Sequence, residues 1–352
     1  MKSPALIAVT LFSLLAFSAC GDSINGLLGK VEKKSLDGLT TVSTFVQNAS
    51  TPDTTLVSAY SIAAGDNRTC ALTTLGELEC WGQFKERNIN EGLPRVIAKS
   101  ISAGPENHCI TDTADRPLCF GSNEEQSLEI NNFKKPVKAI SSGLRHVCLI
   151  ERDSRLPHCW ANEANRELID GTPKDLELTA ISAGLFHTCG IAKLDKLVTC
   201  WGHPKAPRLT RPPRNIYAKT VATGRLRSCA IDLDNAVECW PRDNVEFDDV
   251  KQPLELKAKA VAVGGLHICA IRNSDDPALN NRVECWGSSP YGAHIAPKDL
   301  RAREITAGEN YVCAVTLENT VECWGRYGDP DDLNAKPHEK PTTNHFGLER
   351  SQ

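Results

Sequence analysis

Short apolar segments recur along most of this chain at a nearly constant interval. Each begins with Ile or Val, continues through small residues and ends at a glycine. The seven segments are Ile62–Gly65, Ile101–Gly104, Ile140–Gly143, Ile181–Gly184, Val221–Gly224, Val261–Gly264 and Ile305–Gly308. A cysteine follows each glycine, and successive cysteines of this set are 39, 39, 41, 40, 40 and 44 residues apart. Such a period is typical of propellers and other repeat arrays, so we predict seven copies of one structural unit.

Within one copy, apolar residues alternate as they do in β-strands. In the first copy, Cys70 and Leu72 fall on one face of a predicted hairpin and Ala71 on the other. The segments Pro94–Ile97 and Lys135–Val137 predict a further, outer strand. About 40 residues would then hold four short strands, the content of one propeller blade. The expected fold is therefore all-β, a seven-bladed β-propeller.

Fourteen of the fifteen cysteines fall into seven pairs, one per copy. The members of a pair are 10 or 11 residues apart in six copies and 16 in the other, with turn-forming residues between them. A hairpin of this length places two cysteines opposite each other, at a Cα separation of about 4.5 Å that a disulfide spans. The predicted intra-repeat disulfides are Cys70–Cys80, Cys109–Cys119, Cys148–Cys159, Cys189–Cys200, Cys229–Cys239, Cys269–Cys285 and Cys313–Cys323. Zinc binding and reduced, buried thiols are the competing interpretations.

The fifteenth cysteine follows an apolar N-terminal run. Lys2, the run from Ala5 to Phe17 and the sequence Ala19-Cys20-Gly21 resemble a bacterial lipoprotein signal, in which Cys20 carries the lipid. An ordinary secretory signal cleaved after Ala19 is the alternative. Either signal leads to an oxidising compartment, which favours disulfides. We expect a lipid-anchored protein of the bacterial cell envelope, in the outer membrane, facing the periplasm or at the cell surface.

Four regions are predicted along the chain. They are a lipoprotein signal peptide at 1–19, a polar tether at 20–54, the seven-repeat β-propeller at 55–327 and a polar C-terminal tail at 328–352. The tether and the tail are poor in core-forming residues. Because nothing like a further strand follows Trp324-Gly325, we expect Thr55–Tyr60 to complete the last blade.

Two aligned positions of the repeat carry candidate chemistry. The position after the second cysteine holds Trp81, Phe120, Trp160, Trp201, Trp240, Trp286 and Trp324. An aromatic side chain in every copy indicates packing between blades, although a tryptophan cluster can also bind sugars. The position two residues before the first cysteine holds Arg68, Asn107, His146, His187, Arg227, His267 and Tyr311. Its three histidines suggest a metal, but they belong to different copies and would be spread around the ring.

These motifs resemble the repeat of the regulator of chromosome condensation family. The best matches join Ala183–Cys189 with Val198–Gly202, and Val263–Ile271 with Val283–Gly287. The resemblance covers about residues 55 to 327 and implies the family's seven-bladed propeller, in which the histidine is structural. The unit is shorter than the family's and lacks its Asn-x-x-Gly-Gln-Leu-Gly stretch, so it is more similar to the secreted bacterial branch that includes a β-lactamase inhibitory protein. Guanine-nucleotide exchange and chromatin binding are therefore not expected.

The connections after the Trp-Gly positions vary most between copies. The fourth, His203–Lys219, contains no acid, whereas the fifth, Pro241–Lys257, is rich in Asp and Glu. The predicted partner surface comprises Lys205, Arg208, Arg211, Arg214, Asp248 and Asp249. Such patches would steer a charged partner, and ordinary solvated loops are the alternative. The net charge of −4 argues against nucleic-acid binding.

No catalytic motif accompanies the repeats. The sequence contains no Gly-x-Ser-x-Gly elbow, P-loop, His-Glu-x-x-His or dinucleotide fingerprint. We therefore expect no enzyme, no cofactor and no metal, but a monomeric scaffold that binds another protein of the cell envelope. The alternative is an inhibitor of an envelope enzyme, either β-lactamase-like or a cell-wall enzyme. Glycan binding is a third interpretation.

Overall fold

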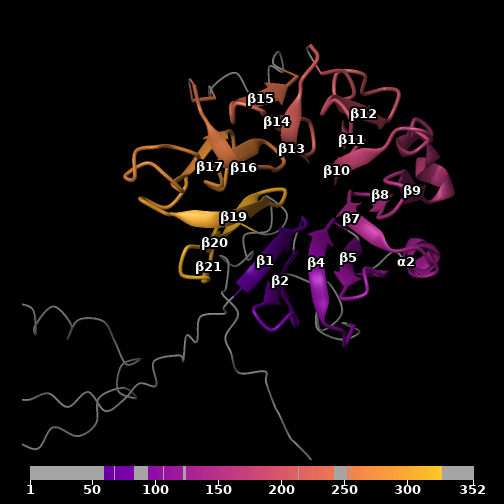
Figure 1. Ribbon diagram of the computed structural model, residues 1–352. Coiled ribbons are helices and arrows are strands. Elements are labelled where there is room, and N and C mark those ends of the chain that lie inside the picture. The colour runs from indigo at the N-terminus through magenta and orange to yellow at the C-terminus, as the bar shows by residue number, and fades with distance from the viewer. Residues whose placement is uncertain are drawn as a thin grey trace, which may run out of the picture. The chain divides into compact units, whose positions relative to one another are not determined.

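The computed structural model describes residues 59–326, except 67, 83–93, 106, 122–123, 213, 242–251 and 254. These residues form seven antiparallel three-stranded sheets, each of which is one blade of a ring (Figure 1). The chain is thus an all-β, seven-bladed propeller, as the repeats predict. Cys20, with the predicted signal, tether and tail, lies outside the described residues, and so do Asp248 and Asp249.

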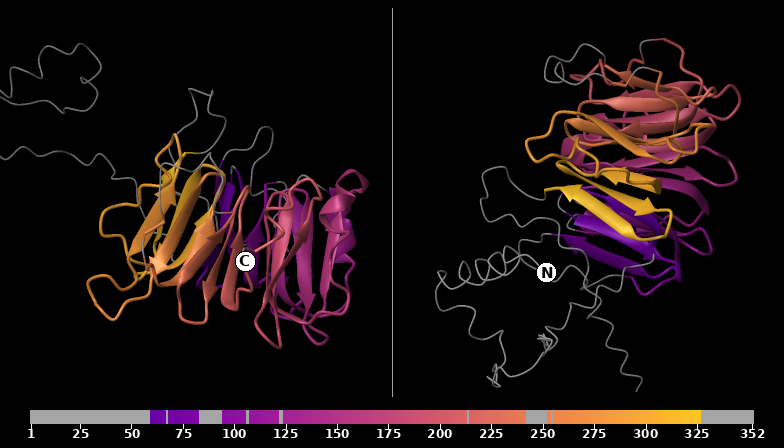
Figure 2. Two further views of the ribbon diagram at one scale, coloured as in Figure 1. Left: turned by 90° about the horizontal axis from the view of Figure 1, so that it is seen from above. Right: turned by 90° about the vertical axis from the view of Figure 1, so that its left-hand side faces the viewer.

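Each blade has an inner, a middle and an outer strand, in chain order. The inner strands are β1 (Ala59–Ala64), β4 (Ala98–Ala103), β7 (Val137–Ser142), β10 (Leu178–Ala183), β13 (Ala218–Thr223), β16 (Ala258–Val263) and β19 (Ala302–Ala307). The middle strands are β2 (Arg68–Thr73), β5 (Asn107–Asp112), β8 (His146–Glu151), β11 (His187–Ala192), β14 (Ser228–Asp232), β17 (His267–Arg272) and β20 (Tyr311–Thr316). The outer strands are β3 (Leu78–Gly82), β6 (Pro117–Gly121), β9 (Pro157–Ala161), β12 (Val198–Gly202), β15 (Val237–Trp240), β18 (Val283–Gly287) and β21 (Val321–Gly325). The inner strands line a central channel. Figure 1 shows them at the middle of the ring, and Figure 2 shows neighbouring blades side by side from two other directions.

The turn between the middle and outer strands contains a left-handed residue in every blade. These residues have φ between +61° and +78° and are Gly76, Asp115, Arg155, Lys196, Asn235, Asn281 and Asn319. Each carbonyl oxygen accepts a hydrogen bond of 2.7 to 2.9 Å from the first residue of an inner strand in the next blade. For Asn319 the donor is the N–H of Ala59, so the bond joins the last blade to the first (Figure 1). One repeated backbone contact therefore sets each step between blades and also closes the ring.

Three strands form each blade, not the four predicted from the sequence. Pro94–Ile97 lie outside any strand, and only Val137 of the second predicted segment is in a strand, as the first residue of β7. In blades 5, 6 and 7 the segment before the inner strand forms a single bridge with the preceding blade instead, for example Leu197 with Tyr217. Because the short repeat uses these residues to cross between blades, they add no strand to their own sheet.

The expected closing strand at Thr55–Tyr60 is described only at its last two residues, because 55–58 lie outside the described residues. Ala59 and Tyr60 belong to β1, which pairs with β2 in the first blade rather than with a strand of the last blade. The N–H of Ala59 also forms the backbone hydrogen bond to Asn319 that joins the two blades.

Within the part of the chain that the structure describes, two short helices occur where the sequence predicts none. They are α2 (Glu124–Asn131) and the 3-10 helix η2 (Glu163–Leu168), both too short for a clear 3.6-residue pattern. In α2, Asn131 accepts the N–H of Cys119 at 2.7 Å and donates to its carbonyl oxygen at 3.1 Å, which covers the edge of β6. Among the described residues, no helix is long and apolar enough to cross a membrane.

All seven predicted disulfides are present, one in each blade. Each joins facing residues of the middle and outer strands, with Cα atoms 4.0 to 4.1 Å apart. Cys269 and Cys285 keep this register although 16 residues separate them, because the additional residues lie in the turn between β17 and β18. The fourteen cysteines of the described residues are therefore bound to one another in pairs, which leaves none of them as a zinc ligand or a free thiol.

The aromatic column packs between neighbouring blades. Trp201 of blade 4 lies in a buried cluster with Ile150 of blade 3, and Trp240 of blade 5 in one with Ile191 of blade 4. Trp81 of blade 1 packs in the same way against blade 7. The column therefore supplies the core between blades rather than a platform for sugars.

Candidate functional site

Seven glycines, one from each blade, surround one mouth of the channel. They are Gly65, Gly104, Gly143, Gly184, Gly224, Gly264 and Gly308. A Cβ atom added to any of them would lie 2.2 to 2.6 Å from the carbonyl oxygen of the glycine in the next blade. This separation is far below van der Waals contact, so only glycine allows the blades to approach this closely. Blade packing, rather than a ligand, explains the repeated glycine.

An ion pair crosses this mouth between two blades that are not neighbours. Arg225 Nη1 of blade 5 lies 2.5 Å from Glu309 Oε1 of blade 7. Blade 6 has Gly265 at this position, where a Cβ atom would lie 2.7 Å from the carboxyl carbon of Glu309. Gly265 therefore leaves the space that the ion pair occupies.

The channel wall is built from small side chains that join the blades. Ser102, Ser141, Ser182 and Thr306 each accept an inner-strand N–H of the next blade, at 2.9 to 3.0 Å. The wall encloses about 240 Å³ and consists of Ile, Val, Ala, Ser and Thr, none of which titrates. The wall can donate and accept hydrogen bonds but supplies neither an acid nor a base.

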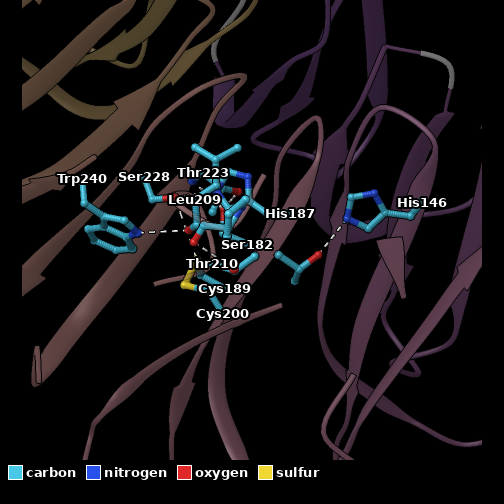
Figure 3. The surroundings of a disulfide bond; sticks show 12 residues. His146, Ser182, His187, Cys189, Cys200, Leu209, Thr210, Thr223, Ser228 and Trp240 are labelled. Atoms are coloured by element: carbon cyan, nitrogen blue, oxygen red, sulfur yellow. Dashed lines mark hydrogen bonds between the residues drawn. A yellow bond between two sulfur atoms is a disulfide. The ribbon is translucent and has the colours of Figure 1, made fainter. Parts of the chain in front are cut away.

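The three histidines of the aligned column are buried between blades. His146 Nε2 lies 2.7 Å from Thr188 Oγ1, and His187 Nε2 lies 2.5 Å from Ser228 Oγ, in each case in the next blade (Figure 3). Burial lowers the pKa of His146 and of His267 to about 4. Burial, together with repulsion from His146, lowers the pKa of His187 to about 3. At neutral pH these rings are uncharged parts of the blade packing.

The four basic residues of the predicted partner surface lie on one loop, between β12 and β13. They are Lys205, Arg208, Arg211 and Arg214, and all are exposed. The loop is fixed at two buried residues, Leu209 and Ile216. The carbonyl oxygen of Leu209 accepts Trp240 Nε1 at 3.1 Å (Figure 3), and that of Ile216 accepts the N–H of Val198 at 2.9 Å. The structure thus exposes these four cations on one loop whose backbone is anchored at Leu209 and Ile216, named here the basic loop surface.

A second set of exposed basic residues was not predicted from the sequence. Every inner strand has a register shift, a β-bulge, at its second residue. In five blades this bulge residue is basic and exposed: Lys99, Lys138, Lys219, Lys259 and Arg303. The only sequence signal is a Lys or Arg two positions before the Ile or Val of five of the seven apolar segments. Regular strand alternation does not reveal that this position lies on a bulge.

Four of these bulge cations contact the left-handed turn residue of their own blade. The nitrogen–oxygen distances are 2.6 Å for Lys99–Asp115, 2.9 Å for Lys219–Asn235, 2.8 Å for Lys259–Asn281 and 2.9 Å for Arg303–Asn319. A cation paired with an oxygen acceptor is therefore the rule at this end of the blades.

These features define a seven-bladed propeller with one disulfide in each blade. No protein-family model matches the sequence. Similar solved structures include the CRINKLY WD40 ectodomain of the Arabidopsis thaliana receptor kinase ACR4, with 22% identity over 80% of this chain and 98% of that chain and a TM-score of 0.63. The ectodomain of the Physcomitrella patens receptor kinase CR4 is 25% identical over 66% of this chain and 62% of that chain, with a TM-score of 0.55.

Prp20p from Saccharomyces cerevisiae is also similar, with 15% identity over 77% of this chain and 83% of that chain and a TM-score of 0.52. Prp20p is the yeast RCC1 protein, a regulator of chromosome condensation. The family resemblance predicted from the repeats is thereby confirmed for the fold. At these identities the likeness concerns architecture and not activity.

Proposed function

We propose that the protein is a non-enzymatic lipoprotein of the bacterial cell envelope, whose propeller serves as a scaffold for binding another protein. The lipid anchor is inferred from Cys20 and the signal-like sequence before it. Seven disulfides agree with an oxidising compartment. The absence of titratable groups from the described channel wall agrees with binding rather than catalysis.

The basic loop surface is the observation that carries this proposal. Four exposed cations occupy a connection of 17 residues that contains no acid. Because Leu209 and Ile216 are buried, a partner does not have to order the loop backbone when it binds, which lowers the entropic cost of association. The charge selects an acidic protein and raises its rate of encounter.

The same fold binds proteins elsewhere. Prp20p binds Gsp1p and histones, and the two plant structures are ectodomains of receptor kinases. These neighbours support a macromolecular partner as the class of ligand, and the partner's identity must come from this chain's own surface.

Affinity capture from envelope extract tests the scaffold. The baits are the full-length, oxidised protein and a variant in which Lys205, Arg208, Arg211 and Arg214 are each replaced by Gln. The matched control replaces four exposed cations outside this loop, Arg145, Lys174, Lys257 and Lys298, by Gln. We expect a partner that the wild type and the control retain and the loop variant loses. Equal retention by all three baits contradicts the assigned surface, and no specific retention by the wild type contradicts the scaffold.

The captured protein also distinguishes the scaffold from the inhibitor alternative. If the partner is an enzyme whose activity falls in proportion to its occupancy by this propeller, inhibition is the function. If its activity is unchanged, binding alone is the function.

Mass spectrometry of the mature N-terminal peptide tests the anchor separately. We expect a chain that begins at Cys20 and carries acyl groups. A chain that begins at an unmodified Cys20 would contradict the lipoprotein and leave the capture experiment unaffected.

A further inference from the structure

Blade 3 breaks the pairing between bulge cations and turn residues. In blades 2, 5, 6 and 7 the cation meets an aspartate or asparagine oxygen. In blade 3 the corresponding residues are Lys138 in the bulge and Arg155 in the turn, so two positive charges occupy the positions of a cation and its acceptor. Nothing in the blade packing requires this exchange, because the turn conformation is the same as in the other blades.

A third cation comes from the next blade. Lys196 is the left-handed turn residue of blade 4, where the bulge residue is Thr179 rather than a cation. Burial and the positive charges of Arg155 and Lys196 together lower the pKa of Lys138. Lys138 therefore feels the positive charge of both turn residues, Arg155 of its own blade and Lys196 of the next.

Neighbouring acids of the described chain are engaged by other cations. Asp115 contacts Lys99 and Arg152, each at 2.6 Å. Glu151 contacts Lys135 at 2.9 Å, and Glu177 contacts Lys193 at 2.6 Å. Among the ion pairs of the described residues, none joins Lys138, Arg155 or Lys196 to an acid. The carboxylate of Asp195, which precedes Lys196, accepts the N–H of Leu197 at 3.0 Å.

The backbone holds two of the cations in fixed turns. The carbonyl oxygen of Arg155 accepts the N–H of Leu178 at 2.8 Å, and that of Lys196 accepts the N–H of Ala218 at 2.9 Å. Arg155 and Lys196 are also only half-exposed. A ligand that binds here meets preformed turns rather than mobile ones, which reduces the ordering cost of binding.

We propose that Lys138, Arg155 and Lys196 form a binding site for a phosphate-type dianion. A dianion neutralises most of the three positive charges, whereas a carboxylate neutralises only one. The planar guanidinium of Arg155 offers paired N–H donors to two phosphate oxygens, and the two lysines act as point charges. The site goes beyond the scaffold function, because it uses the turns of blades 3 and 4 and not the cations of the basic loop surface.

Calorimetric titration of the full chain at low ionic strength tests the site. The probes are inorganic phosphate, glycerol 3-phosphate and, as a monoanion control, acetate. We expect saturable binding of one phosphate per chain, with acetate at least tenfold weaker. Lys138→Gln should weaken phosphate binding at least tenfold, whereas Lys219→Gln, at the same bulge position in blade 5, should change it less than twofold.

Thermal unfolding provides a second readout that does not depend on the calorimetric signal. Phosphate should raise the Tm of the wild type and of Lys219→Gln but not that of Lys138→Gln. Without phosphate, Lys138→Gln should be at least as stable as the wild type, because the repulsion is removed.

The proposal is overturned if the wild type shows no saturable phosphate binding, if Lys138→Gln binds phosphate as the wild type does, or if acetate binds as tightly as phosphate. The site is supported whichever of the two phosphate probes binds more tightly, and the tighter one indicates the source of the ligand. Tighter binding of glycerol 3-phosphate indicates a phosphate ester on a larger molecule, and tighter binding of inorganic phosphate indicates the free ion.

Discussion

Acidification should destabilise the propeller through its buried column histidines. The pKa values of His146, His187 and His267 are about 4, 3 and 4 in the folded protein, against about 6.5 in an unfolded chain. Between these limits the unfolded state binds protons that the folded state excludes. The free energy of unfolding therefore falls as the pH falls from about 7.5 towards 4, and above about 7.5 these groups contribute almost no pH dependence.

The magnitude follows from these values. At pH 5, protonation stabilises an unfolded histidine by about 2 kcal/mol, and a folded one with a pKa of about 4 or lower by less than about 0.1 kcal/mol. Three such residues lower the free energy of unfolding by roughly 6 kcal/mol between pH 8 and pH 5. This loss is comparable with the whole stability of many domains, so the effect is large enough to measure. Burial also lowers the pKa of His108, which adds to the loss in the same direction.

Urea unfolding of the oxidised protein at pH 8 and at pH 5 measures this difference. His187→Asn is the informative variant, because blade 2 already has a buried asparagine, Asn107, at the same position. The variant loses the hydrogen bond to Ser228, so its stability at pH 8 is lower, but its loss between pH 8 and pH 5 should be about 2 kcal/mol smaller than in the wild type. An unchanged difference, or a His187 ring signal that titrates near pH 6.5 by NMR, would refute the reasoning.

Three further predictions concern the same packing. Gly143→Ala places a Cβ atom 2.4 Å from the carbonyl oxygen of Gly184 and should lower the free energy of unfolding in urea by more than about 3 kcal/mol. The control, Gly292→Ala, has φ +75° and no atom within 4 Å of the added Cβ, so it should lower that free energy by about 1 kcal/mol. Equal losses would contradict the role of the glycines in blade packing. Burial raises the pKa of Glu304, whose carboxylate accepts a hydrogen bond from Ser61 Oγ. Glu304→Gln should therefore be at least as stable as the wild type at pH 7.5, and its stability should rise more steeply with pH than that of the wild type. A variant less stable than the wild type at pH 7.5 would argue against this account. Reduction should remove about 2 to 3 kcal/mol per bridge and unfold the protein, as circular dichroism would show, and non-reducing peptide mapping should find only intra-blade pairs.

The repeat period and the cysteine pairs were sufficient to predict the fold. Both features are spacings that can be read from the sequence, and the spacing of two cysteines is enough to predict that they face each other in a hairpin. The number of strands per blade was not predictable in this way. Pro94–Ile97 have the composition of a strand, but Val96 packs in a cluster with Leu72 of the preceding blade. Which blade a connecting segment contacts depends on geometry that no local pattern encodes.

The binding surfaces were predictable only in part. Lys205, Arg208, Arg211 and Arg214 stand out because their loop contains no acid, and the structure places all four on the surface. The cations at the blade 3 edge come from two turns and one bulge, 41 residues apart for Arg155 and Lys196. Only the closed ring brings such residues together, so no window of sequence shows them as a cluster.

Departures from the repeat are more informative than the repeat itself. Each blade must supply a glycine, a disulfide, an aromatic side chain and a left-handed turn, and these positions are explained by packing. Where a copy changes a residue that packing does not constrain, the change can serve a ligand. The acid-free fourth connection and the exchange of an oxygen acceptor for Arg155 are both of this kind, and the second leaves like charges close together. That repulsion supports no contact between blades, and the proposed site gives the three cations a common role, because a bound dianion would relieve it.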